Sequence, residues 1–152
     1  MGNNHIYNVE KGDFVSIYNQ DYTVDQVIKL GTGNNNNVNI LIKDGSLRKW
    51  LCLRNYGEVF FVLCDEMTLE IRDFTDQLSY NNNGYDILNK GSVRAIATSN
   101  LGYPQYINID FFDYLRKDKL EYLFVQIISG KVTFMIGEPV ISTAIMVYPR
   151  PK

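Results

Sequence analysis

The residue types in this chain leave little room for chemistry that depends on histidine. Histidine occurs once, as His5, close to the start of the chain. A Ser-His-Asp or Cys-His site needs a histidine base beside its nucleophile. A structural zinc site needs several Cys or His ligands at suitable spacing. The sequence therefore predicts no catalytic site of these kinds, no metal site and no cofactor.

Carboxylates are the remaining candidates for acid or base chemistry. Asp65 and Glu66 are sequence neighbours, so on a strand their side chains point to opposite faces. Asp110 and Asp113 flank a segment that could form a short helix, where acids commonly act as caps. Glu121 opens an apolar stretch, and if buried it would need a lysine or a backbone donor as partner. We interpret all of them as ordinary structural acids, and Glu121 is the acid we choose if the chain has a site.

Aromatic residues are the more distinctive set, with 11 Tyr, 8 Phe and 1 Trp. Tyr and Trp combine an apolar body with a polar tip, which suits both core edges and interfaces. Trp50 and Phe124 fall on one apolar face of two predicted hairpins. That face is either a second core layer or a contact surface for a partner or a second subunit. The alternative is a small-molecule pocket between two halves of the chain, lined by Trp50, Tyr22, Tyr106 and Glu121.

The elements that position these residues begin with an apolar hairpin between residues 120 and 136. Ser129-Gly130 predicts a two-residue turn, because glycine accepts the positive φ that such turns need. One face then pairs Ile127 with Val132, Val125 with Phe134 and Leu123 with Ile136. The other face pairs Ile128 with Lys131, Gln126 with Thr133 and Phe124 with Met135. A one-residue slip would bury Lys131 and Thr133, so the register should be firm.

An earlier segment, residues 51–63, repeats this pattern. When the two segments are aligned on Gly57 and Gly130, Phe61 falls on Phe134 and Leu63 on Ile136. The alignment makes Asn55-Tyr56-Gly57 a three-residue loop, places Leu53 opposite Val59 and Leu51 opposite Phe61, and equates Trp50 with Phe124. The similarity reflects either an internal duplication, with halves at about 10–73 and 84–148, or the chance likeness of apolar hairpins.

The same alignment predicts that the two cysteines are separated. Cys52 would lie opposite Phe60, and Cys64 four residues farther along, on the order of 13 Å away at the rise of a strand. A disulfide cannot close such a gap. Two reduced thiols suit a reducing cytoplasm, and no signal peptide is visible.

Turn signals divide the rest of the chain into short strands. Strands are predicted at 14–18, 22–30, 38–43, 47–54, 58–65, 67–73 and 106–110, with a surface loop at 31–37. A further hairpin is predicted from 85–88 and 92–98 around Asn89-Lys90-Gly91, and 111–119 is the one candidate for a short helix. This spacing is typical of an all-β sandwich or a partly open barrel built from antiparallel hairpins. The length of 152 residues fits a single domain, 1–152.

Charge and hydropathy exclude further classes of function. The net charge is −2 and the isoelectric point about 5.3. No basic run is present, and non-specific nucleic-acid binding depends on Lys and Arg that neutralise phosphates. No apolar run approaches the roughly 18 residues of a membrane span. We therefore expect neither nucleic-acid binding nor membrane insertion.

Short motifs along the chain resemble the bacterial domain family DUF4178. Its first half is similar at Gly12-Asp13-x-Val15, Tyr22-x-Val24 and Trp50-Leu51. Its second half is similar at Tyr85-x-Ile87-Leu88, the strand 93–97, Leu120-Glu121, Gly130 and Gly137. The resemblance covers about residues 10 to 148. It implies a cytoplasmic bacterial protein with no established activity, often encoded near polyamine-synthase-like or envelope-stress genes.

This sequence departs from the family pattern in its Asn-rich loop at 31–37 and in lacking the acidic aromatic strand usual around 38–43. The resemblance therefore assigns no shared ligand. Our leading hypothesis is a non-enzymatic module that binds another protein or a second copy of itself. The alternative is a barrel that binds a small molecule between its two halves.

Overall fold

The computed structural model describes residues 6, 8–30, 37–98 and 103–148, and these residues form an antiparallel β structure. The predicted loop at 31–37 lies outside this part of the chain, apart from Asn37. The strands are β1 (Phe14–Ile17), β2 (Gln20–Leu30), β3 (Asn37–Asp44), β4 (Leu47–Asn55), β5 (Val59–Met67), β6 (Gln77–Tyr80), β7 (Asn83–Ala97), β8 (Gln105–Arg116), β9 (Tyr122–Ile128), β10 (Lys131–Val140) and β11 (Ile145–Tyr148). One turn of 3-10 helix, η1 (Ser142–Ala144), connects β10 to β11. The all-β prediction is confirmed.

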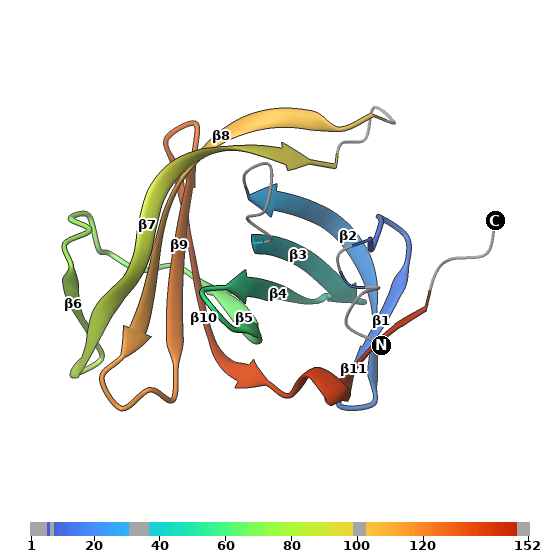
Figure 1. The fold of residues 1–152 in the computed structure, drawn as a ribbon, viewed down its shortest axis with the longest axis horizontal. Coiled ribbons are helices and arrows are strands. Elements are labelled where there is room, and N and C mark those ends of the chain that lie inside the picture. Colours follow the sequence, from blue (N-terminus) through green and yellow to red (C-terminus); the bar gives the residue numbers. More distant parts are fainter. Residues whose placement is uncertain (1–5, 7, 31–36, 99–102, 149–152) are drawn as a thin grey trace.

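Eight of the strands close into a barrel. The sheet runs in the order β11-β1-β2-β3-β4-β5-β10-β9-β8-β7-β6, and an additional pairing of β2 with β7 closes the ring. Strands β1 to β5 form one antiparallel meander and β6 to β10 form another (Figure 1). The meanders meet at two seams, β5 with β10 and β2 with β7. Strands β1, β11 and β6 lie beyond the closed ring.

The predicted register of the β9–β10 hairpin is confirmed at each of its six residue pairs. Its turn residues Ser129 and Gly130 have φ of 51° and 80°. Two successive residues with positive φ match the twist of the strands that they join, which fixes this register locally.

The predicted register of the β4–β5 hairpin is wrong by two residues. Leu53 lies opposite Phe61 and Asn55 opposite Val59, because the three loop residues are Tyr56, Gly57 and Glu58. Gly57, with φ of 95°, is the middle residue of this loop, whereas the prediction made it the last one. Val59 therefore begins a strand at the surface, whereas Phe61 is buried.

This shift also corrects the expectation for the cysteines. Cys64 pairs with Trp50 and Cys52 with Val62, so the two cysteines are diagonal neighbours on one face instead of being far apart. Both are buried and free. Burial, and then the neighbouring Cys52, raise the pKa of the Cys64 thiol.

Three further predictions about local structure are wrong. Residues 85–98 do not form a hairpin, because β7 runs through Asn89-Lys90-Gly91 with a bulge between Ile87 and Asn89. Residues 111–116 are strand instead of helix, since β8 pairs with β7 and β9 along this length. Strand β5 ends at Met67, so no strand occupies 68–73. In the first two cases strand pairing overrides the local signal.

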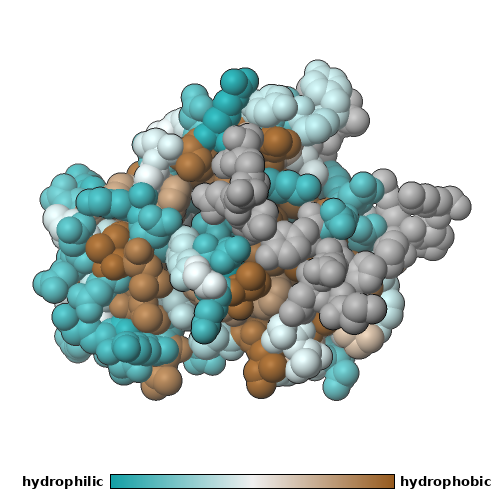
Figure 2. Space-filling model, viewed as in Figure 1, coloured by the Kyte–Doolittle hydropathy of each residue, from teal (hydrophilic) through white to brown (hydrophobic). Residues whose placement is uncertain are grey.

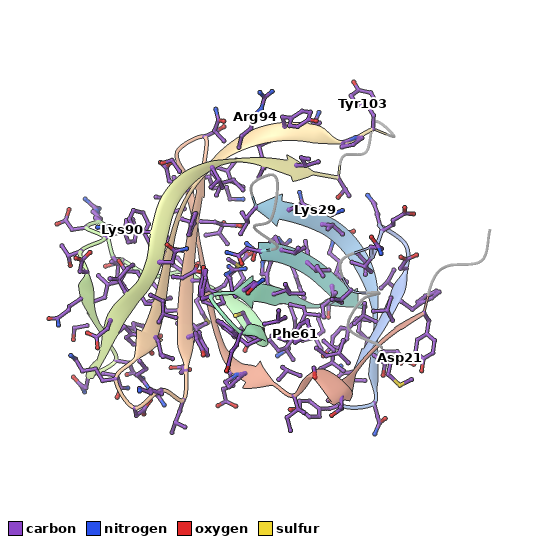
Figure 3. The ribbon with its side chains drawn as sticks, in the orientation of Figure 1. Asp21, Lys29, Phe61, Lys90, Arg94 and Tyr103 are labelled. Atoms are coloured by element: carbon purple, nitrogen blue, oxygen red, sulfur yellow. The ribbon has the colours of Figure 1, made fainter. Side chains whose placement is uncertain are left out.

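Alternating side chains divide the interior into three apolar clusters. The barrel core lies inside the ring and includes Trp50, Cys52, Phe124 and Met135. The first outer core lies on the other face of β2 to β5 and is covered by β1 and β11; it includes Val15, Tyr22, Leu53 and Phe61. The second outer core lies under β6 and residues 69–74 and includes Tyr85, Tyr114, Val125 and Phe134. In Figure 3 the Phe61 side chain lies among those of the first half.

The face carrying Trp50 and Phe124 is therefore core, because these side chains are 3% and 0% exposed. Of the two alternatives for this face, a core layer and a contact surface, the structure selects the first. No helix in the described part of the chain is long and apolar enough to cross a membrane.

Candidate functional site

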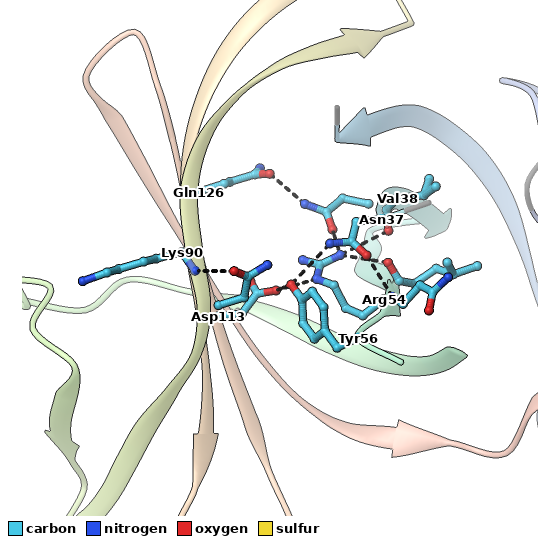
Figure 4. Close-up of polar contacts among 11 residues, drawn as sticks. Asn37, Val38, Arg54, Tyr56, Lys90, Asp113 and Gln126 are labelled. Carbon is cyan, nitrogen blue, oxygen red and sulfur yellow. Dashed lines mark hydrogen bonds and ion pairs between the residues drawn. The ribbon is translucent and has the colours of Figure 1, made fainter. Parts of the chain in front are cut away.

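Two polar sites stand out, and the first is a buried quartet inside the barrel (Figure 4). It consists of Asn39 on β3, Arg54 on β4, Asp113 on β8 and Gln126 on β9. Their inward positions follow from strand alternation, because each shares its face with barrel-core residues on the same strand. All four are at most 3% exposed. A buried ion pair with its hydrogen-bond partners thus joins the two meanders.

The quartet is held by a connected set of hydrogen bonds. Arg54 Nε donates to Asp113 Oδ2 at 2.7 Å, and Arg54 Nη1 donates to Asn39 Oδ1 at 2.8 Å. Asn39 Nδ2 donates in turn to Gln126 Oε1 at 3.0 Å. The Tyr56 hydroxyl donates to Asp113 Oδ2. The Arg54 guanidinium also lies 4.4 Å from the centre of the Phe124 ring.

Electrostatics in this site favour the ion pair. Burial alone lowers the pKa of Arg54, but the Asp113 carboxylate more than offsets this, and the net pKa of Arg54 is raised. Burial, followed by the Asp113 charge, raises the pKa of Tyr56. Arg54 is therefore a permanent cation and Tyr56 a neutral donor at ordinary pH. Asp113 Oδ1 is the buried side-chain atom that has no hydrogen-bond partner among the described residues.

The second site, which we name the seam groove, is an open groove of about 500 Å³. It lies over the outer face of the β5–β10 seam, with Leu63, Ile136 and Val140 in its lining. Tyr18 of the β1–β2 turn and Asn81 of the β6–β7 turn also line it, so both meanders contribute. None of the four quartet residues lines this groove.

Charged side chains converge on the seam groove from both meanders. From the first, Lys49 Nζ lies 2.8 Å from Asp65 Oδ1. From the second, Glu121 Oε2 accepts hydrogen bonds from the Tyr85 hydroxyl at 2.7 Å and from Arg116 Nη1 at 3.0 Å. Burial, followed by the Glu121 hydrogen bond, raises the pKa of Tyr85. The phenol is therefore a neutral donor over the ordinary pH range.

Corresponding positions of the two meanders meet at both sites. In the β5–β10 seam Leu63 pairs with Glu138, and Asp65 pairs with Ile136. If Leu63 is taken as the counterpart of Ile136, and Asp65 as the counterpart of Glu138, each of these two pairs becomes the other when the meanders are exchanged. The hairpin registers then equate Trp50 with Tyr122, which corrects its predicted equivalence with Phe124.

The same correspondence extends to the charged residues of both sites. The strand registers equate Lys49 with Glu121, Arg54 with Gln126, and Asn39 with Asp113. The two meanders are therefore related by an approximate two-fold symmetry, and each site is built from equivalent positions of both meanders. A common origin of the two halves stays a prediction.

The structure separates the residues that the sequence proposed for one site. Trp50 and Phe124 lie in the barrel core, where Trp50 Nε1 donates to Glu66 at 3.0 Å, and Tyr22 lies in the first outer core. Tyr106 is on the surface under Arg94, which projects outward from β7 (Figure 3). Of the residues chosen from the sequence, Glu121 lines the seam groove.

Neither site contains the elements of a metal centre. No group of three or more His, Cys, Asp or Glu residues in the described ranges could hold a metal ion, and His5 lies outside those ranges. The cations of both sites, Arg54, Lys49 and Arg116, instead pair with neighbouring carboxylates. Such an arrangement can orient and bind polar groups.

The fold and its two sites define a closed eight-stranded antiparallel barrel, built from two meanders, with a polar groove over one seam. Residues 10–142 match the family model described as Domain of unknown function (DUF4178). The chain belongs to this family. No curated protein and no solved structure matches it.

Proposed function

We propose that this domain is a non-enzymatic binding module whose seam groove holds a small organic ligand. The observation that carries the proposal is the groove itself, about 500 Å³ in volume, with polar groups converging on it from both meanders. Ligand pockets commonly fall between about 300 and 1,000 Å³ and combine an apolar lining with a few oriented polar groups. Leu63, Ile136 and Val140 supply the apolar part, and Tyr85, Arg116 and Glu121 supply the polar part.

The burial of Trp50 and Phe124 adds indirect support. A partner-binding face at these residues would need them at the surface, and they are core. On the face drawn in Figure 2, hydrophobic residues form separate patches among hydrophilic ones. Small-molecule binding therefore becomes the leading function, ahead of a protein contact on the Trp50 face.

A metabolite thermal-shift screen tests the proposal. Ligands that bind the folded state raise its melting temperature by mass action. The screen should be run on the wild type, on Glu138→Trp, which fills the groove from an exposed position, and on Val59→Trp. Val59 is exposed on β5 and lies outside the groove lining, so its variant controls for an added indole. Hits that Glu138→Trp abolishes and Val59→Trp retains support the function; hits unaffected by Glu138→Trp, or none, overturn it.

A second candidate function, self-association, rests on the β1–β11 end of the sheet. Among the described strands, β11 pairs with β1 alone, and Phe14, Met146 and Tyr148 there are 43%, 53% and 47% exposed. Phe14 and Tyr148 are direct cross-strand neighbours. An exposed edge with apolar side chains is a template for pairing with another chain. Sedimentation of the wild type beside Met146→Lys tests this candidate, and a dimer that the lysine disrupts is the expected result.

We further propose that the domain works in the cytoplasm. Its support is the pair of neighbouring cysteines, which are free and buried. Neighbouring thiols stay reduced most readily in a compartment that keeps disulfides from forming.

A further inference from the structure

The charges that line the seam groove are unbalanced. Lys49 and Arg116 are its cations, and Asp65, Glu121 and Glu138 are its anions. The lining thus carries one more negative than positive charge. Asp118, which accepts from Arg116 Nε at 2.8 Å just outside the lining, adds to the negative side.

Both cations of the groove are already engaged. Lys49 is paired with Asp65 at 2.8 Å, and Arg116 is held by Glu121 and Asp118 at 3.0 and 2.8 Å. An anionic ligand would have to displace one of these carboxylates. The free energy of the existing ion pair would therefore oppose its binding.

Glu138 is the exception among the charged lining residues. It is exposed on β10, and no ion pair or side-chain hydrogen bond joins it to another residue of the described chain. It lies on the outer face of the strand, next to Ile136 and Val140 along the groove. A cation can thus reach a carboxylate without breaking an existing contact, while its apolar body covers the neighbouring floor.

Tyrosines add to the attraction for a cation. Tyr18, Tyr80 and Tyr85 all line the groove. The face of an aromatic ring attracts an ammonium or guanidinium group, because the ring quadrupole gives that face a partial negative charge. The Tyr85 hydroxyl is committed as a donor to Glu121, so this phenol cannot also donate to a ligand anion.

We propose that the seam groove binds a small organic cation, with an ammonium or guanidinium group at Glu138 and an apolar body over Leu63, Ile136 and Val140. This inference rests on the proposed function and names the ligand class of the same groove. It follows from Glu138 as the charged lining residue that has no ion pair within the described ranges, from the excess of carboxylates and from the tyrosine lining.

Matched probes test the charge of the ligand. Titration calorimetry would compare n-hexylammonium, hexanoate and hexanol with the wild-type protein, Glu138→Gln and Glu58→Gln. Glu58 is an exposed acid in the β4–β5 loop outside the groove, so its variant controls for net charge. We expect hexylammonium to bind best, with Glu138→Gln weakening it about three- to tenfold, the range for losing one exposed charge-assisted contact. Glu58→Gln should leave its affinity unchanged.

The contrary outcomes separate this inference from the function on which it rests. Hexanoate or hexanol binding as tightly as hexylammonium, or an affinity for hexylammonium unaffected by Glu138→Gln, would overturn the cation class. If metabolite hits remain sensitive to Glu138→Trp in that case, the groove still binds ligands and the proposed function stands. A short lysine peptide that binds more tightly than hexylammonium would also overturn the small-molecule class, in favour of a protein side chain.

Discussion

At the scale of single residues, the buried quartet depends on keeping its charges balanced. Arg54→Gln leaves the Asp113 carboxylate buried without its cation, and breaking such a pair costs about 3–5 kcal/mol of unfolding free energy. The double variant Arg54→Gln, Asp113→Asn removes both charges and keeps amide hydrogen bonding. We expect it to be more stable than Arg54→Gln alone.

Urea denaturation of both variants and of Asp113→Asn measures this coupling. Lys90→Gln is the control, because the Lys90–Asp76 ion pair is exposed and should contribute no more than about 1 kcal/mol. A double variant whose destabilisation equals the sum of the single ones would show that Arg54 and Asp113 do not stabilise each other.

Tyrosines set the behaviour of the protein at high pH. Burial, and then the charge of Asp76, raise the pKa of Tyr114 from 10.0 to about 12. Below pH 10 this phenol is protonated in both the folded and the unfolded chain. Between pH 10 and 12 the unfolded chain ionises first, so the stability that a neutral Tyr114 contributes is lost across that window.

Burial raises the pKa of Tyr22 and Tyr122 in the same direction. The unfolding free energy should therefore fall steadily as the pH rises above 10. Urea melts at several alkaline pH values measure the slope, and phenolate absorbance reports the ionisation. A stability that stays flat to pH 12 would contradict the assigned burial of these phenols.

The residues of the quartet are visible in the sequence only in retrospect. Three of the four are flanked on both sides by apolar residues, as in Val38-Asn39-Ile40 and Phe112-Asp113-Tyr114, whereas Arg54 is followed by Asn55. Such interruptions mark inward polar positions, but they do not say which strands face each other across a barrel. Glu121 was identified from its position at the start of an apolar strand, whereas Lys49 and Glu138 resemble ordinary surface charges.

At the scale of elements, the seam between β5 and β10 depends on Gly137. A Cβ at this position would lie 2.0 Å from the Leu63 carbonyl oxygen, which is fixed in the neighbouring strand. Gly137→Ala should therefore cost about 3 kcal/mol or more, because the backbone must move apart. Gly91→Ala is the matched control, since its Cβ meets a Phe111 ring atom at 3.3 Å. Thermal melts that rank the two variants equally would contradict this account.

The two phenylalanines in corresponding places of β5 and β10 should contribute similarly. Phe61 and Phe134 are 2% and 4% exposed, in the first and second outer cores. Replacing either with Ala should cost about 3–5 kcal/mol through lost burial and a residual cavity. Val59→Ala, at an exposed strand end, should cost within about 0.5 kcal/mol. Chemical denaturation of the three variants checks this order.

Turn chemistry explains which elements the sequence could predict. Ser129-Gly130 fixes its hairpin because both residues take positive φ, and the register followed correctly. Asn89-Lys90-Gly91 has the composition of a turn, yet β7 pairs continuously with β8 on both sides of it. The register of β4–β5 failed because a single glycine fits more than one position of a three-residue loop. Local signals therefore suffice where one turn type satisfies them and fail where long-range pairing decides.

At the scale of the whole molecule, the sequence predicted an all-β domain but not the closure of its sheet. Closure depends on β2 meeting β7 and β5 meeting β10, pairings between segments far apart in the chain. Apolar alternation requires that two faces of β4 and β9 be covered, and the barrel core and the outer cores cover them. No short-range pattern specifies which strand lies on the other side.

The overall charge predicts the response to nucleic acids. With a net charge of −2 and 15 Lys and Arg against 17 Asp and Glu, the sequence has no excess of cations to neutralise phosphates. We expect no measurable binding to single-stranded RNA at physiological salt in a fluorescence anisotropy titration. Saturable binding at that salt would contradict this expectation.

The two joints between the meanders are unequal in length. Strands β5 and β10 share seven residue pairs, from Phe134–Met67 to Val140–Phe61, whereas β2 and β7 share two, Ile28–Ala97 and Lys29–Ile96. The β5–β10 joint is therefore the more extensively paired of the two, and the β2–β7 joint is the shorter. If β2 separated from β7, the meanders would stay joined through β5 and β10, and the seam groove lies over that longer joint. A molecule bound at Glu138 in the groove would contact both meanders beside their longer joint, so we expect its binding to influence how readily the shorter joint opens.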